Sequence, residues 1–380
     1  MGDYVRQMPD QGSQDMARPP RASQRLHIDV PLLVLLLALT LYGMFVLYSA
    51  SGQSIAAVER QGRYFVLAYV VMIAAAQIGL QRYTRWAPWL YVLGVGMLVA
   101  VIFVGVGAKG AQRWLNLGGI RFQPAEIMKL AVPMALAAFL AERILPPRFL
   151  YVAGALLLLG IPAVLILLQP DLGTALLIAA SGLFVLFMAG ISWRYIVGAV
   201  VVAIASAWPA WIFVLKDYQK QRILTLLNPE SDKLGAGWNI IQSKTAIGSG
   251  GWSGKGWQQG TQSQLDFLPE SHTDFIIAVL AEEQGLQGVL ILVAIYLLIL
   301  LRGFWIGLHA QTSFGRMMAG SLTLTFFVYI FVNMGMVAGL LPVVGVPLPL
   351  VSAGGTSIVT LMAGFGILMA ISTEQRLVAR

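Results

Sequence analysis

Ten apolar stretches, each long enough to cross a lipid bilayer, dominate this chain of 380 residues. A transmembrane helix needs about 20 consecutive, mostly apolar residues. The composition agrees, since 58% of the residues are hydrophobic, 11% are charged and the mean hydropathy is +0.77. These values lie outside the range of soluble globular domains. We therefore expect an all-α, polytopic membrane protein with ten transmembrane helices.

Charged residues, Pro and Gly separate the apolar runs and so place the helices. The expected ranges are 30–50, 64–81, 87–107, 125–142, 149–168, 172–190, 193–216, 274–300, 315–340 and 351–372. We expect one membrane domain over 28–375, which includes a large polar loop over 217–273. The tail over 1–27 is rich in Pro, Gly, Ser and Gln, a composition typical of disorder. A short C-terminus follows over 376–380.

The distribution of Lys and Arg predicts the orientation, because short loops rich in these residues stay in the cytoplasm. With cytoplasmic termini, thirteen basic residues lie on the inner side and five in the short outer loops. The inner residues are Arg6, Arg18, Arg21, Arg25, Arg82, Arg85, Arg143, Arg148, Arg194, Arg302, Arg316, Arg376 and Arg380. The outer residues are Arg60, Arg63, Lys109, Arg113 and Arg121. We therefore expect both termini to be cytoplasmic and the loop over 217–273 to be extracytoplasmic.

Other functional classes lack their sequence signals. The net charge of +8 could suggest nucleic-acid binding, but about half of the basic residues are those that set the orientation in the membrane. The sequence also has no basic stripe interleaved with aromatic residues, which nucleic-acid binding would favour. The sequence contains no P-loop and no His pair at metal-binding spacing. The absence of cysteine excludes disulfides, thiolate metal sites and a cysteine nucleophile.

Acidic side chains near or inside the apolar stretches are the most informative, because ionised groups there are costly and usually functional. Glu126 and Lys129 are three residues apart on an expected helix, so they share a face and can neutralise each other. The pair either only orders the helices or takes part in function. Asp171 lies at a break between two helices, where it can cap the second one. A contact with a cation or with substrate is the alternative role for Asp171.

Asp274 is the main candidate for chemistry. Thr273 can cap the eighth expected helix, whose dipole then favours a carboxylate at Asp274 in the first turn, and this role needs no further function. Two features favour catalysis. His272 and Glu270 are close in sequence, so several titratable groups converge as proton transfer requires. Glu282 is expected near the same helical face, about 12 Å deeper at ~1.5 Å per residue.

An excess of basic residues remains on the expected outer side, including Lys109, Arg113 and Arg121. Such a surplus could hold an anionic, lipid-anchored substrate. For any single one of these residues, a solvated loop surface is the simpler explanation.

Several segments carry a more specific signal. They read Lys109-Gly-Ala-Gln-Arg113-Trp114-Leu, Arg121-Phe-Gln-Pro124-Ala-Glu126, Gln169-Pro-Asp171-Leu-Gly-Thr174, Gly237 through Gly256, Phe267-Leu-Pro-Glu270-Ser-His272-Thr-Asp274-Phe275, Ala281-Glu-Glu283-Gln-Gly285 and Pro342-Val-Val-Gly-Val-Pro-Leu-Pro-Leu-Val-Ser352. Over roughly residues 28–375 the chain thereby resembles the SEDS family (shape, elongation, division and sporulation), and its rod-shape members most. It departs from the family's pattern at Ala125, where Ser is common, and at Ala353, where an aromatic residue is usual.

The resemblance implies ten helices, an inner-membrane location and peptidoglycan glycosyltransferase activity that polymerises lipid II during cell elongation and rod-shape maintenance. In that family the aspartate matching Asp274 is essential and is the proposed catalytic residue. The residues matching Glu126 and Lys129 are linked to activity and its control. The resemblance also implies Mg²⁺ or Mn²⁺, a class B penicillin-binding protein transpeptidase as partner and other membrane proteins of the elongation complex.

The expected reaction is attack by the 4-hydroxyl of an incoming lipid II sugar on the anomeric carbon of a chain held on undecaprenyl pyrophosphate. The pyrophosphate leaves and the configuration inverts. Asp274 would act either as general base or as ligand of the cation. Arg113 and Arg121 could offset the charge of the leaving group. The sequence itself contains no complete ligand set for a metal.

Two other classes of function are compatible with these residues. A lipid II flippase could use Glu126, Lys129 and Glu282 as relay groups within the membrane. A non-catalytic membrane scaffold for a transpeptidase is the other. Against the flippase, the most concentrated polar chemistry lies on one surface, whereas alternating access favours a site near the midplane.

Substrates anchored by long lipids must enter from the side, so we expect a groove between helices that opens to the outer leaflet. Pro342, Pro347 and Pro349, followed by Gly354 and Gly355, break the helical pattern where such a cavity could form. A tight re-entrant loop is equally compatible with these residues.

Overall fold

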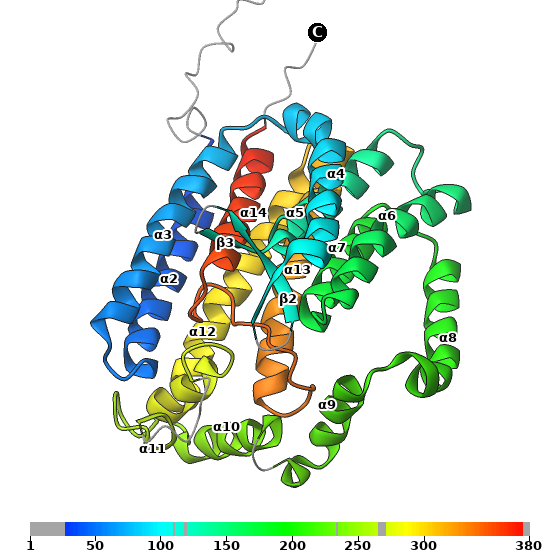
Figure 1. Ribbon diagram of the computed structural model, residues 1–380. Coiled ribbons are helices and arrows are strands. Elements are labelled where there is room, and N and C mark those ends of the chain that lie inside the picture. The colour runs from blue at the N-terminus through cyan, green and yellow to red at the C-terminus, as the bar shows by residue number, and fades with distance from the viewer. Residues whose placement is uncertain (1–26, 109–110, 118–119, 233–234, 265–270, 375–380) are drawn as a thin grey trace, which may run out of the picture.

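The computed structural model describes residues 27–108, 111–117, 120–232, 235–264 and 271–374. A helix occupies each of the ten expected places (Figure 1). These helices are α2 (Val30–Ala50), α3 (Ile55–Ala76), α4 (Leu80–Val104), α5 (Pro124–Ala141), α6 (Phe149–Leu168), α7 (Leu172–Met188), α8 (Trp193–Pro209), α12 (Ile276–His309), α13 (Ser313–Val337) and α14 (Thr356–Thr373).

Seven helices in the described part of the chain are long and apolar enough to cross a membrane. They are α2, α4, α5, α6, α12, α13 and α14. The helices α7 and α8 are apolar but shorter, and α3 carries more charge. The protein is therefore a polytopic helical membrane protein, whereas a count of ten spans stays a prediction.

Several expected boundaries were wrong. The second helix begins at Ile55 rather than at 64, because the side chain of Ser54 caps it by accepting the Ala57 N–H at 3.3 Å. The polar residues Glu59 and Arg60 in its first turns hid this start from a search for apolar runs. The third helix begins at Leu80, seven residues before the expected start.

Two connecting regions contain structure that the apolar pattern did not predict. After α4 the chain forms a small antiparallel sheet in the order β1 (Val106–Ala108), β2 (Ala111–Leu117) and β3 (Ile120–Phe122). The long polar loop is partly helical. It holds, after a π-helical turn η1 (Ala210–Val214), the elements α9 (Asp217–Leu227), η2 (Pro229–Ser231), α10 (Ala236–Gly250) and α11 (Thr261–Gln264). We call the end of the bundle that carries α9, α10 and α11 the loop end (Figure 1).

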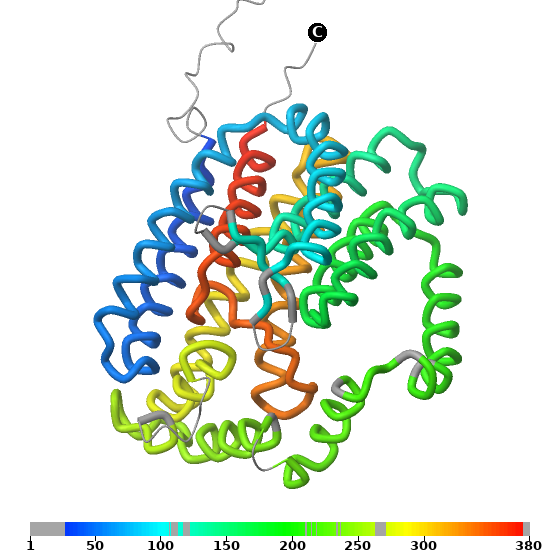
Figure 2. The backbone as a smooth tube through the Cα atoms, viewed as in Figure 1, coloured from blue at the N-terminus to red at the C-terminus, as the bar shows by residue number. Residues whose placement is uncertain are grey.

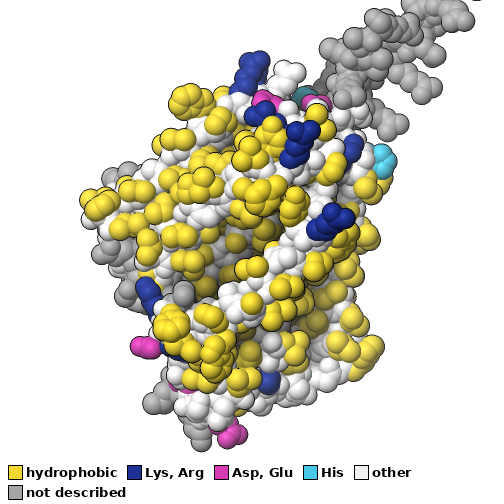
Figure 3. Space-filling model, turned by 90° about the vertical axis from the view of Figure 1, so that its right-hand side faces the viewer, with side chains coloured by type: hydrophobic (Ala, Val, Ile, Leu, Met, Phe, Trp, Pro, Cys, Tyr) yellow, Lys and Arg dark blue, Asp and Glu magenta, His cyan; other side chains and the backbone are white. Residues whose placement is uncertain are grey.

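The helices form a bundle with α5, α13 and α14 inside. In α5, 72% of the most apolar window is buried, compared with 28% in α4 and in α6. The interior helix α5 packs against α4, α7 and α13, while α14 packs against α3. Figure 2 shows α8 at the side of the bundle, and none of its described residues is buried. The face on that side is broadly apolar, with most charged side chains near its two ends (Figure 3), as expected of a surface against lipid.

The first and last described residues meet at the end opposite the loop end. His27 Nδ1 lies 3.0 Å from the Thr373 hydroxyl, and Arg302 binds the Asp29 carboxylate through two nitrogens at 2.7 and 3.0 Å. Burial opposes the charged form of Asp29, but its hydrogen bonds, from Arg302 above all, outweigh burial and lower its pKa below the usual value. This cluster ties α2 to α12 at the end of the bundle where the described chain begins and ends.

Candidate functional site

A cavity of about 1320 Å³ lies at the loop end, where several helices begin or end. The end of α2, the first turns of α3, α5, α7 and α14, and the strand β2 contribute to its wall. The coil before α14 contributes Gly345 to Pro347 and Ala353 to Gly355, as the Pro and Gly residues predicted. Its charged lining residues are Arg60, Arg113, Glu126, Lys129 and Asp171, with His272 at the edge of the long loop.

Glu126 and Lys129 lie side by side in this wall on the first turns of α5. Lys129 Nζ is 2.8 Å from Glu126 Oε1, and both side chains are about nine-tenths buried. Lys129 also lies over the ring of Tyr329, 5.4 Å from its centroid. The other carboxylate oxygen, Glu126 Oε2, is buried and has no hydrogen-bond partner among the described residues. The predicted ion pair is therefore present in the cavity wall, and one of its oxygens is buried without a hydrogen-bond partner among the described residues.

Asp171 caps α7, as predicted, by accepting the Thr174 N–H at 3.2 Å. Its other oxygen accepts a hydrogen bond from Gln123 at 3.1 Å and lies 3.8 Å from the Arg113 guanidinium. Arg113 also donates to the backbone carbonyls of Gln169 and Pro170. Because a third of the Arg113 side chain stays exposed, it can still face a ligand in the cavity.

Asp274 lies beside this cavity and not within a helix. Its neighbours Ser271, His272 and Thr273 line the cavity, whereas Asp274 itself is not one of the lining residues. The helix α12 begins at Ile276, and Phe275 occupies its N-cap position without a side-chain hydrogen bond. Residues 271–275 form a turn instead, so the prediction that Thr273 caps the helix was wrong. A Cβ placed on Gly345, which lines the cavity, would be 3.6 Å from Asp274 Oδ2. The carboxylate therefore faces the cavity wall beside Gly345.

The backbone around Asp274 is held by two polar side chains from elsewhere in the bundle. Asn333 on α13 donates to the Asp274 carbonyl at 2.9 Å and to the Val346 carbonyl at 2.8 Å. The Ser352 hydroxyl donates to the Thr273 carbonyl at 2.5 Å. These contacts fix the turn against the coil before α14. Asp274 thus has a defined position relative to the cavity, which a catalytic group requires.

Glu282 does not lie in this cavity. Its side chain is fully buried and binds Lys255 at 2.7 Å, and it is not among the residues that line the cavity. The expectation that it lies about 12 Å deeper than Asp274 stays a prediction. Ser271 donates to the Ala50 carbonyl and Ser49 donates to Glu283, so both ends of the segment 271–283 contact the end of α2.

Three predicted residues cannot be placed. Glu270 and Lys109 lie outside the described residues. Arg121 belongs to β3, but its side chain is not described.

His272, in contrast, is placed by the structure. It is exposed and lines the cavity, two residues before Asp274.

Sequence reasoning missed several polar residues of the cavity wall and its support. They are Arg60, Gln61, Tyr64, Gln123, Tyr329, Asn333 and Ser352. The sequence held a signal for some of them, since a polar residue inside an apolar helix, such as Asn333, usually has a partner there. Arg60 had been counted only as an orientation charge.

The described residues do not form a complete protein site for a metal ion. No group of three or more His, Asp or Glu side chains among them could hold one. A carboxylate beside the cavity, Asp274, remains as a single ligand. Mg²⁺ is often held by one or two carboxylates together with substrate phosphates, so a substrate pyrophosphate would have to complete the site.

Fold and site together define a polytopic helical membrane protein with a large polar cavity and a carboxylate, Asp274, held next to the cavity wall at Gly345. A family model described as FtsW/RodA/SpoVE cell cycle protein matches residues 30–377. The chain belongs to this family, which confirms the predicted SEDS membership.

Relatives of known name cover nearly the whole chain. The peptidoglycan glycosyltransferase MrdB of Escherichia coli K12 is 55% identical over 94% of this chain and 96% of its own. The probable peptidoglycan glycosyltransferase FtsW of Geobacter metallireducens is 37% identical, over 92% and 95%.

Solved structures agree with the fold. A chain from a peptidoglycan synthase complex that coordinates polymerization and crosslinking superposes with a TM-score of 0.80 at 31% identity, over 90% of this chain and 97% of that one. The rod shape determining protein RodA of Thermus thermophilus has a TM-score of 0.69 at 28% identity, over 90% and 96%.

Proposed function

We propose that this protein is a peptidoglycan glycosyltransferase that polymerises lipid II into glycan strands during cell elongation. The observation that carries the proposal is the Asp274 carboxylate, which lies next to Gly345 in the wall of a polar cavity of about 1320 Å³ in a membrane-embedded bundle. The names of the relatives, and the rod-shape relatives among them, support the same activity.

The proposed chemistry is inverting glycosyl transfer. The 4-hydroxyl of the incoming lipid II sugar attacks the anomeric carbon of the growing chain, and the bond to the pyrophosphate oxygen breaks. Asp274 accepts the hydroxyl proton as general base, a role worth about 10²–10⁴-fold in rate. The turn that holds Asp274 is anchored by Asn333 and Ser352, so the carboxylate needs little reorganisation before the reaction.

Basic groups of the cavity wall would bind the leaving pyrophosphate. Arg60 and Arg113 line the cavity, and the exposed part of Arg113 is free to approach an anion. The first turn of α14 begins in the same wall at Thr356, where helical N–H groups and the helix dipole favour negative charge. Glu126, with one oxygen unpaired, would accept a hydrogen bond from a sugar hydroxyl or the peptide of the substrate.

Family membership also suggests a divalent cation, which would give Asp274 an alternative role. Asp274 would be its protein ligand and the pyrophosphate oxygens its other ligands. When bound there, Mg²⁺ or Mn²⁺ would offset the charge that develops on the leaving group. Asp274 would then serve as ligand rather than as base.

The proposed location is the bacterial inner membrane with both termini in the cytoplasm and the cavity on the outer side. His27 and Thr373 meet at one end of the bundle, which is consistent with termini on one side. The proposed partner is a class B penicillin-binding protein transpeptidase, together with other membrane proteins of the elongation complex. The similarity to a chain from a peptidoglycan synthase complex supports such a partner.

The test uses the purified protein and labelled lipid II in detergent, where no sidedness exists. We expect glycan polymer from the unmodified protein and none from Asp274→Ala, with unchanged thermal unfolding in both. A flippase or a scaffold would form no polymer in this assay. Polymer from Asp274→Ala at the unmodified rate would remove Asp274 from the reaction.

A further inference from the structure

The helix α12 is broken at Gly285, and part of the long loop fills the break. Gly285 has φ 67°, in the left-handed region. Four backbone hydrogen bonds join residues 282–287 to residues 251–256 across the break. They are Leu286 N–H to Gly251 O (2.9 Å), Gln287 N–H to Trp252 O (3.2 Å), Lys255 N–H to Glu282 O (3.0 Å) and Gly256 N–H to Glu283 O (3.0 Å). The backbone groups that the break would leave unpaired are thus paired with the loop.

Glycine is required on both sides of this junction. A Cβ on Gly285 would collide with the backbone N of Gly254, and a Cβ on Gly254 would collide with the Glu283 carbonyl. Gly254 also has a positive φ of 77°. The loop and the broken helix therefore fit at backbone contact, which only glycine permits.

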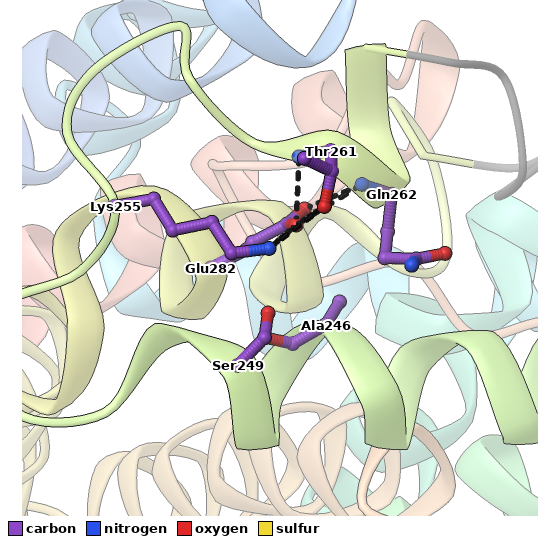
Figure 4. A network of polar contacts seen from close by, with 6 residues as sticks. All are labelled: Ala246, Ser249, Lys255, Thr261, Gln262 and Glu282. Carbon is purple, nitrogen blue, oxygen red and sulfur yellow. Dashed lines mark hydrogen bonds and ion pairs between the residues drawn. The ribbon is translucent and has the colours of Figure 1, made fainter.

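The carboxylate of Glu282 also binds loop residues between Lys255 and Gln262 at this junction (Figure 4). It is fully buried and accepts hydrogen bonds from Lys255 Nζ at 2.7 Å and from the Thr261 N–H at 2.8 Å. The Thr261 hydroxyl (3.1 Å) and the Gln262 N–H (3.0 Å) also donate to it. A buried carboxylate with this many donors is well compensated, and it holds residues 255–262 in one arrangement.

A short helical segment connects Glu282 to Asp274. Residues 276–281 are all buried, with exposures of 0 to 6%, so they are packed on every side. At the other end of this segment, Asn333 and Ser352 hold the turn that carries Asp274. Packed interiors transmit displacement rather than absorb it. The place of Asp274 at the cavity therefore depends on how the junction at residues 282–287 is held.

We propose that Glu282 is a positioning residue for the glycosyl transfer. Its carboxylate locks residues 255–262 onto the broken helix α12, and the buried segment 276–281 carries that fixed position to Asp274. The inference rests on the proposed role of Asp274. A shift of about 1 Å in a catalytic group can lower a rate by ~10²-fold, so a side chain remote from the cavity can control the reaction in this way.

The first test measures kcat and KM for lipid II with Glu282→Ala and Glu282→Gln, and hydrogen exchange of the amides of residues 276–281. We expect kcat to fall by about 10²-fold in Glu282→Ala with KM within about 3-fold of the unmodified value. We expect those amides to exchange faster. The matched control is Glu230→Gln, an exposed glutamate in the same loop, which should change neither quantity.

The second test replaces the carboxylate by a covalent link. The chain has no cysteine, so Lys255→Cys combined with Glu282→Cys introduces a single pair. The Lys255 N–H and the Glu282 carbonyl are 3.0 Å apart, which brings the two main chains within reach of a disulfide. We expect the reduced double variant to be as slow as Glu282→Ala and the oxidised one to regain kcat.

Two results would overturn the proposal. One is unchanged kcat and unchanged exchange in folded Glu282→Ala. The other is an oxidised double variant, with the disulfide confirmed by mass spectrometry, that stays as slow as the reduced form, because Glu282 would then act through its own chemistry. If the unmodified protein makes no polymer, the proposed function fails, whereas the exchange measurement still decides whether Glu282 holds residues 276–281.

Discussion

Two buried ion pairs at opposite ends of this bundle differ in how completely they are satisfied. Both carboxylate oxygens of Asp29 have partners, from Arg302, Ser372 and the Leu32 N–H. Glu126 binds Lys129 through one oxygen, while the other is buried without a partner among the described residues. Buried polar groups in folded proteins are normally paired, so an unpaired oxygen beside a cavity indicates a binding role. The Asp29 cluster holds helices together, and the Glu126 pair belongs to the site.

The largest expected effect is on stability, from Asp29→Ala. The substitution leaves the partly buried Arg302 without its carboxylate, so we expect a cost below the value of about 3–5 kcal/mol for a fully buried pair. We expect thermal unfolding in detergent at a clearly lower temperature, with polymerisation per folded molecule unchanged. An unfolding temperature equal to that of the unmodified protein would mean that the Asp29 cluster does not stabilise the packing of the helices.

The converse substitution at the site is Lys129→Met. It removes the charge that compensates Glu126 in the cavity wall, and we expect the rate of polymerisation to fall by about 10²-fold, equivalent to ~2.7 kcal/mol. The unfolding temperature should change less than for Asp29→Ala. Lys244→Met on the exposed side of α10 is the control and should keep full activity. Full activity in Lys129→Met would make the pair structural, like the one at Asp29.

A smaller effect is expected at the support of Asp274. Asn333→Leu keeps the side-chain size but removes the hydrogen bonds to the carbonyls of Asp274 and Val346, at a cost of about 1–3 kcal/mol. We expect a lower kcat and faster hydrogen exchange near residue 346. Asn228→Leu, at the exposed end of α9, is the control. Normal kcat in Asn333→Leu would show that the other contacts of the turn, from Ser352, Ser271 and the Ala353 N–H, are sufficient to hold it.

The smallest effect is a pH dependence confined to acid. Because the pKa of Asp29 is lowered in the folded protein, its contribution to stability is complete above the unfolded value of 3.8 and is lost as the pH falls through the folded value. The difference in unfolding temperature between the unmodified protein and Asp29→Asn should be constant from pH 8 to about pH 5. It should shrink below about pH 4. A difference that already shrinks near pH 6 would contradict the ion-pair geometry.

Much of the architecture was predictable from the sequence alone. The hydrophobic effect acts on local composition, so apolar runs of about 20 residues identify spanning helices without knowledge of their packing. The capping role of Asp171 and the pairing of Glu126 with Lys129 were also predictable, because both depend on residues three apart in the chain. Motif order was sufficient to predict the family and pointed to Asp274.

The tertiary structure decided everything that depends on residues far apart in the chain. Asn333 reaches the Asp274 carbonyl across 59 positions, and Gln61 binds the backbone at Ser352 across 291. No local pattern encodes such contacts, which arise only when several helices have packed. The same holds for the break at Gly285, whose unpaired backbone groups are satisfied by residues 251–256. A membrane helix can be interrupted only where another segment supplies those hydrogen bonds, and the tertiary fold determines which segment lies there.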